Sequence, residues 1–124
     1  MPDTKKEKLN QILKSLKEVG NIIGSSIISV DGLQIASDLS GNVDADTFAA
    51  MSAAMQGAAE TAVSELKQGE LKQIIIDADK GKLITISAGK KAILVILASP
   101  KINLGLALLE VGKASRKISD VLGG

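Results

Sequence analysis

The chain has 124 residues, which is enough for one domain and too few for two of ordinary size. Its apolar share of 45% and charged share of 23% are typical of a folded globular protein, and its one aromatic residue, Phe48, disfavours aromatic-lined ligand pockets and base-stacking surfaces. The net charge is +1 with acids and bases spread along the chain, so no nucleic-acid partner is expected; the lysines at 5, 6, 8, 14 and 17 are interpreted as the solvated face of a helix.

The first predicted element is an amphipathic helix over residues 5–19. Thr4 and Glu7 form a capping box, in which each side chain can satisfy a backbone N–H of the first turn. Gly20 and Asn21 follow as a stop, because both tolerate the left-handed conformation. The apolar residues recur at helical spacing and predict one buried face: Leu9, Ile12, Leu13, Leu16 and Val19.

A β-hairpin is predicted next, from two β-type runs at 22–30 and 33–37. Asp31-Gly32 separates them, and this dipeptide favours a two-residue turn in which both residues have positive φ. Residues 38–43 are predicted to form a loop.

A long helix is predicted over 45–67, with Asp44 as N-cap and Gly69 just past its end. Its larger apolar stripe is predicted to lie on a sheet: Phe48, Met51, Met55, Ala59, Ala62 and Leu66. A second stripe of small residues runs beside it: Ala50, Ala54, Gly57 and Thr61. Since one stripe is enough to pack a helix on a sheet, the second indicates a contact surface; the alternative is that alanine is simply the best helix former.

Three strands at 71–77, 83–88 and 92–98 and a last helix over 104–122 complete the pattern. The run 92–98 is apolar without alternation, so it is predicted to be central, with helices covering both of its faces. The predicted fold class is an α/β (α+β) sandwich of order α-ββ-α-βββ-α, with a five-stranded antiparallel sheet between helices. It forms a single domain over residues 1–124, with its core at about 5–122.

Strand 71–77 is a candidate for an exposed sheet edge, because it holds three consecutive isoleucines and no proline. Pairing of two such edges around a two-fold axis would also bring two copies of helix 45–67 together. The predicted homodimer interface is Ala50, Ala54, Gly57, Thr61, Leu71, Gln73, Ile74, Ile75 and Asp77. The residues predicted to bind another partner are Phe48, Met51, Met55 and Ala58, since methionine packs adaptably at protein-binding surfaces.

The residues for ordinary catalysis are missing from the sequence. Without histidine or cysteine there is no usual general base, thiolate or zinc ligand set, and no phosphate-binding glycine motif occurs. We therefore expect no enzyme activity, no metal and no cofactor. The opening MPDTKKEK lacks the basic start and apolar run of a signal peptide, so none is expected, and the apolar run 92–98 is far shorter than the ~20 residues that span a bilayer. A cytoplasmic location without membrane contact is predicted.

Two segments carry a family resemblance: SSIISVDGLQIASD at 25–38 and IIIDADKGKLITISAGKKAILVILAS at 74–99. With the surrounding helices, they make the chain resemble the Roadblock family over about residues 9–122. That family includes dynein light chains, Ragulator subunits and a bacterial polarity-GTPase activating protein. The most specific part is the hairpin Val30–Ser37, and the second is Gly81–Leu97.

The resemblance implies strand order 2-1-5-4-3, with the first and last helices on one face and helix 45–67 on the other. It also implies dimers that join through strand 71–77 and helix 45–67, and a Ras-like small GTPase, or proteins associated with one, as partner. The only arginine, Arg116, falls on the last helix, so no arginine finger is expected. The alternative function is a small-molecule sensor of similar architecture, and an enzyme ranks third.

Overall fold

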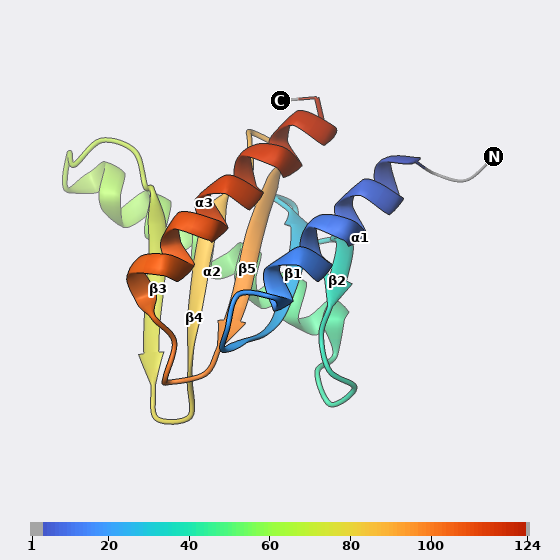
Figure 1. The fold of residues 1–124 in the computed structure, drawn as a ribbon. Coiled ribbons are helices and arrows are strands. Elements are labelled where there is room, and N and C mark those ends of the chain that lie inside the picture. Colours follow the sequence, from blue (N-terminus) through green and yellow to red (C-terminus); the bar gives the residue numbers. More distant parts are fainter. Residues whose placement is uncertain (1–3, 124) are drawn as a thin grey trace.

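The computed structural model describes residues 4–123, which form three helices and five strands (Figure 1). The predicted order of elements is confirmed. In chain order they are α1 (Thr4–Lys17), β1 (Ile22–Ser29), β2 (Gln34–Asp38), α2 (Ala45–Glu65), β3 (Gln73–Ala78), β4 (Gly81–Ser87), β5 (Ala92–Ala98) and α3 (Leu104–Val121).

The five strands form one antiparallel sheet in the order β2-β1-β5-β4-β3, as expected. Strand β5 is central, and every residue in it except Leu97 is buried. Helices cover both faces of this strand, which is the predicted reason for its uninterrupted apolar run. Strands β2 and β3 are the two edges.

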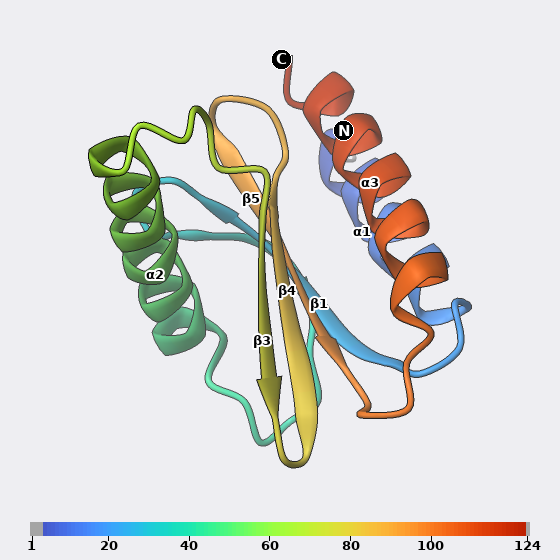
Figure 2. The same cartoon turned by 90° about the vertical axis from the view of Figure 1, so that its left-hand side faces the viewer.

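Helices α1 and α3 cover one face of the sheet and α2 covers the other (Figure 2). The larger core lies between α1, α3 and the sheet and includes Leu13, Ile27 and Ile118. A smaller cluster lies under α2: Ile28, Ala49, Ile93 and Val95, with Phe48, Ala53 and Leu83 packed against it. The α2 side of the sheet is thus covered by less apolar packing than the opposite side.

The hairpin β1–β2 forms, but the predicted turn geometry is wrong. Of the turn residues, only Gly32 has a positive φ, of 92°. Its N–H donates to the Ser29 carbonyl (3.0 Å), while the Ser29 N–H donates to the Leu33 carbonyl (2.8 Å). This is a three-residue loop that ends in a glycine bulge, in which Asp31 avoids the left-handed conformation that is costly for a residue with a Cβ.

The helix ends differ from prediction by a few residues. Helix α1 ends at Lys17, and Asn21 takes the left-handed conformation (φ 72°). Helix α2 ends at Glu65, and Lys67 takes that conformation (φ 56°) before Gly69 is reached. The Gln68 N–H donates to the Val63 carbonyl at 3.0 Å, which completes a Schellman motif.

Candidate interaction surface on helix α2 and strand β3

The side of α2 that faces the sheet is narrower and more polar than predicted. Its buried residues are Ala49, Ser52 and Gln56, spaced three and four apart. Met51 and Leu66 are 66% and 70% exposed and Ala62 is exposed, so the prediction that these three lie on the sheet is wrong. Small side chains at Ala49 and Ser52 let the helix approach the strands closely, and the larger residues then point elsewhere.

The predicted stripe of small residues points away from the sheet. Ala50, Ala54, Gly57 and Thr61 are all exposed. A Cβ added at Gly57 would meet no heavy atom within 4 Å, so nothing in the described chain requires a glycine there. The Thr61 hydroxyl donates to the Gly57 carbonyl at 3.0 Å and therefore lies along the helix instead of standing out from it. The result is a shallow, nearly uncharged helical surface.

Strand β3 follows α2 in the chain and is an edge of the sheet; among the described residues its one strand neighbour is β4. Ile76 is opposite Leu83, which belongs to the small cluster, so Ile74 and Ile76 lie on the α2 side of the sheet. Ile75 is opposite Ile84 of the larger core and therefore lies on the α3 side, where it is 40% exposed.

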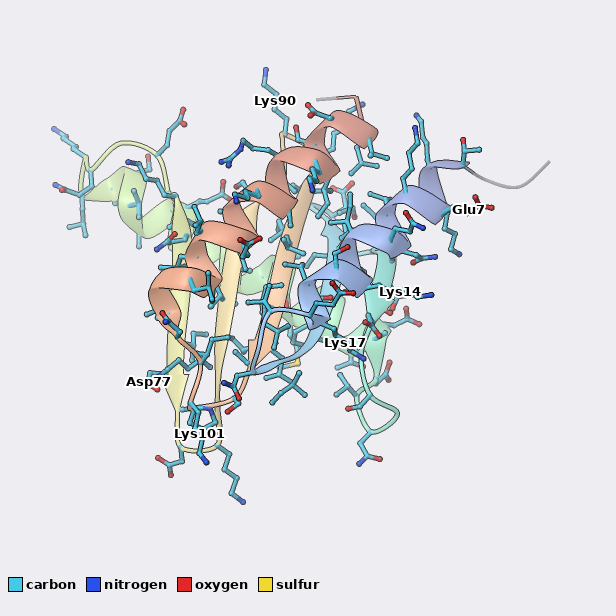
Figure 3. All side chains as sticks on the ribbon, in the orientation of Figure 1. Glu7, Lys14, Lys17, Asp77, Lys90 and Lys101 are labelled. Atoms are coloured by element: carbon cyan, nitrogen blue, oxygen red, sulfur yellow. The ribbon has the colours of Figure 1, made fainter. Side chains whose placement is uncertain are left out.

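The strand residues predicted for the interface are thus divided between the two faces of β3. Ile74 lies on the α2 side, whereas Gln73, Ile75 and Asp77 lie on the α3 side. Leu71 is half-buried and precedes the strand, which starts two residues later than expected. The Asp77 carboxylate, labelled in Figure 3, already pairs with Lys82 of β4 at 2.6 Å. What the predicted positions within β3 have in common is the unpaired backbone edge of this strand.

An apolar groove of about 370 Å³ lies between the start of α2 and the β3–β4 hairpin. It exists because α2 packs mainly on β1 and β2 and leaves the sheet uncovered toward β3. Its apolar lining includes Leu39, Val43, Phe48, Ile76, Leu83 and Leu97. Of these six, only Phe48 was among the expected site residues. The two apolar residues in the polar loop 38–43 are a usable signal for Leu39 and Val43.

The residues predicted to bind a partner differ in their availability. Met51 and Ala58 are exposed on α2, whereas Met55 is half-buried. Phe48 is also half-buried, because it both packs on the small cluster and lines the groove. The exposed small residues and the exposed methionine thus lie on α2, and the apolar groove at its start is lined in part by the edge strand β3.

Helix α2 is weakly acidic, whereas Lys80 and Lys82 line the groove beside it. Helix α2 contains Asp46, Glu60 and Glu65 and no basic residue. At its start, Asp44 accepts hydrogen bonds from the Asp46 N–H (3.1 Å) and the Thr47 N–H (3.3 Å), which confirms the predicted N-cap. The Thr47 N–H, followed by the Thr47 hydroxyl, holds the pKa of the Asp44 carboxyl below its usual 3.8.

Over residues 4–123, no group of three or more acidic side chains is arranged to hold a metal ion. No helix in the same range has the length and apolar character needed to cross a membrane. What this surface can offer is apolar contact and a strand edge for backbone pairing.

Comparison with known proteins identifies related sequences and folds. A model of the Roadblock/LC7 domain matches residues 8–98. Two Methanocaldococcus jannaschii proteins, MJ1340 and MJ0310, both described as uncharacterized, are each 40% identical to the chain over 110 residues; the match covers 89% of this chain and 96% of each relative.

Solved structures share the fold at low sequence identity. MglB of Myxococcus xanthus superposes with a TM-score of 0.90 at 21% identity, over 99% of this chain and 93% of that one. A Roadblock/LC7 domain from Streptomyces avermitilis gives 0.85 at 20% identity, over 92% and 97% of the two chains. An MglB described as having a tetrameric arrangement gives 0.87 at 17% identity, over 98% and 92%.

Proposed function

The chain belongs to the Roadblock/LC7 family, and from that premise we propose that it is a non-catalytic homodimeric scaffold or regulator that binds a Ras-like small GTPase, or proteins associated with one. The proposal treats residues 1–124 as a single cytoplasmic domain. Self-association would use the stripe Ala50, Ala54, Gly57 and Thr61 together with the edge of β3.

The observation that carries the proposal is the bare stripe of small residues on α2 beside an unpaired strand edge. An open edge presents unpaired N–H and C=O groups, and small residues allow a second helix to approach closely. A two-fold axis at this edge would satisfy both features with one partner, a second copy of the chain. Self-association also occurs within this fold, since the MglB described as tetrameric has it.

The partner is proposed to sit on the α2 side of such a dimer, where Met51 and Ala58 are exposed and the apolar groove opens. Arg116 is exposed on α3, on the opposite side of the sheet from α2. It is therefore badly placed to reach the nucleotide of a GTPase bound to α2. Any change in GTP hydrolysis would come from reshaping the GTPase's own switch region.

The dimer is tested by light scattering after size-exclusion chromatography. We expect a dimer at micromolar concentration, and a monomer for Ala54→Arg, because a long charged side chain at an exposed helical position blocks close packing without disturbing the core. Leu109→Arg, an arginine on an exposed position of α3, is the control and should remain dimeric. A monomeric wild-type protein at this concentration would remove the basis of the proposal.

The partner is tested by pull-down with purified Ras-like GTPases from the same organism, loaded with GDP or with a non-hydrolysable GTP analogue. Retention in one nucleotide state, lost in Met51→Glu, is the expected result. Where hydrolysis is stimulated, Arg116→Ala should leave the stimulation unchanged. A dimer that retains the GTPases in neither state would contradict the partner while leaving the dimer intact.

The alternative of a small-molecule sensor has one observation in its favour, the groove of about 370 Å³ beside Phe48. Native mass spectrometry of the purified protein tests it. A bound small molecule that disappears in Leu83→Lys would favour the sensor over the scaffold.

A further inference from the structure

A second groove, of about 440 Å³, lies on the opposite side of the molecule from α2, between α1 and α3. The two helices pack against each other as well as on the sheet. The groove is therefore the seam between two neighbouring helices on the outer surface of that layer, distinct from the surface proposed for dimerisation.

The floor of this groove is apolar. Ile12 of α1, Val19 just after α1 and Val121 of α3 are half-buried there, beside the buried Leu16 and Ala114. Half-buried branched side chains in a seam leave apolar area that a third element can cover.

The rim of the groove is polar and contains lysines from both helices. Lys113 is partly engaged, since its Nζ lies 3.7 Å from Glu110 Oε1. Lys8 of α1 and Lys117 of α3 are exposed, and over residues 4–123 neither takes part in an ion pair or a side-chain hydrogen bond. Asp120 also lines the groove. Two lysines that are unpaired within the described part of the chain therefore line the groove, one from each helix.

The two faces of the molecule differ in charge. Helix α1 has five lysines and one acid, and α3 has three basic and two acidic residues, so the two helices together carry +5; one of these lysines, Lys17, pairs with Asp38 of β2. Helix α2 carries −3, while the whole chain carries only +1. A partner drawn to the α1–α3 layer by its field should therefore be acidic.

From this geometry and charge, we propose that the α1–α3 groove is a second docking site, which binds an acidic amphipathic helix of another protein. The apolar side of that helix would cover Ile12, Val19 and Val121. Its carboxylates, spaced three or four residues apart, would pair with Lys8 and Lys117. Because the site lies on the far side of the sheet from α2, it could be filled while the α2–β3 surface is occupied.

Dimensions favour a helix as the occupant. Helix α1 has 14 residues and spans about 21 Å, so a ligand helix of roughly the same length would lie along the seam. A third helix laid on two neighbours packs its ridges into the groove between them, as helices do in bundles. A flat anionic membrane would instead meet the lysines at the rim and leave the apolar floor uncovered.

The test uses a fluorescein-labelled peptide of about 14 residues, with leucines at i, i+3, i+4 and i+7 and glutamates beside them, and a matched peptide with lysine in place of each glutamate. Fluorescence anisotropy should show binding of the acidic peptide alone, weaker at about 500 mM salt than at about 50 mM. The double variant Lys8→Glu/Lys117→Glu should weaken binding at least about tenfold at low salt.

The matched control is Lys90→Glu/Lys101→Glu, which changes net charge equally. Lys90 and Lys101 lie on turns outside the groove (Figure 3). This variant should lose less than about threefold, by the general field alone. Circular dichroism and light scattering confirm that each variant is folded and keeps the oligomeric state of the wild type, so failure here is separate from failure of the dimer.

Three results would overturn the inference. One is no binding of the acidic peptide. Another is equal binding of the acidic and basic peptides. The third is equal loss of binding in the two double variants. Vesicles of mixed phosphatidylserine and phosphatidylcholine give the last arm: if they capture the protein through Lys8 and Lys117 while the peptide does not bind, the site recognises lipid and the proposed helix is wrong.

Discussion

One position inside α2 and one just after it hold residues that are unfavourable for the local backbone. Gly57 lies in the helix interior, where glycine costs about 0.5–1 kcal/mol relative to alanine. Lys67 takes the left-handed conformation just after the helix, which is unfavourable for any residue with a Cβ. No packing within the described chain explains the glycine at position 57. At Lys67 the cost comes from the backbone conformation alone.

For Lys67 we therefore predict that replacement by glycine stabilises the fold. Lys67→Gly should raise the free energy of unfolding by about 0.5–1 kcal/mol, because glycine adopts φ 56° without strain and keeps the two backbone bonds of the Schellman motif. Urea denaturation measures the change. Ser64→Gly, three residues earlier and inside the helix, should have the opposite sign, and a loss of stability in both variants would contradict the account.

The cap at Asp44 predicts a dependence of stability on pH. Since the pKa of this carboxyl is lowered in the folded state, its charge stabilises the fold above its usual pKa of 3.8, and that contribution is lost as the pH falls through the folded pKa. Asp44→Asn keeps a capping oxygen without the charge. We expect the wild type to exceed Asp44→Asn in stability at pH about 7, and the difference to shrink toward pH about 3. A difference independent of pH would contradict the cap's ionic contribution.

At the scale of elements, replacing Gly57 tests whether the small-residue stripe of α2 forms a dimer interface or whether the glycine there is merely tolerated by the helix. In the monomeric Ala54→Arg background, Gly57→Ala should raise the free energy of unfolding by about 0.5–1 kcal/mol, because the added Cβ meets nothing. In the wild-type background the same methyl group should weaken dimerisation about fivefold or more, because it would stand in a close helix contact.

Gly112→Ala on α3 is the matched control for this experiment. Gly112 also lies inside a helix, and its added Cβ would have only ordinary contact, 3.8 Å from an Arg116 nitrogen. It should stabilise the fold without changing dimerisation. If Gly57→Ala leaves dimerisation unchanged, α2 does not form the dimer interface.

The elements differ in how far the sequence could specify them. The run Ala92–Ala98 identified the central strand, because only a strand covered on both faces tolerates apolar residues throughout. Helix α1 was equally clear, since its leucines recur at helical spacing on one buried face and its lysines are exposed. The orientation of α2 could not be derived in this way. Its surface is alanine and other small residues nearly all round, so periodicity does not decide which stripe packs inward.

The strand β3 shows the same limit at the candidate site. The three isoleucines marked an edge without specifying which side chain faces which layer, because that depends on the register with β4. The groove beside Phe48 depends on where α2 stops covering the sheet, which is a property of packing between elements distant in sequence. Ser52 and Gln56 of α2 are both buried, so polar character does not identify the exposed side of this helix.

At the scale of the whole molecule, the sheet separates two surfaces of different character. One side has the weakly acidic α2 with its small-residue stripe, and the other has the basic layer of α1 and α3. A dimer that joins β3 to β3 would continue the sheet and keep this separation, with two acidic helices on one side and two basic layers on the other. Unlike partners could then bind the two sides of one assembly.

If the dimer is coupled to folding, thermal stability must depend on protein concentration. Association removes native monomer from the unfolding equilibrium, so Tm of the wild type should rise by roughly 2–5 °C for each tenfold increase in concentration. Ala54→Arg should show the same Tm at every concentration, because its exposed arginine prevents association without entering the core. Scanning calorimetry over a hundredfold range, with Leu109→Arg as the variant that still associates, measures both. A wild-type Tm that does not change over this range would leave the edge of β3 and the stripe on α2 without a second copy to cover them.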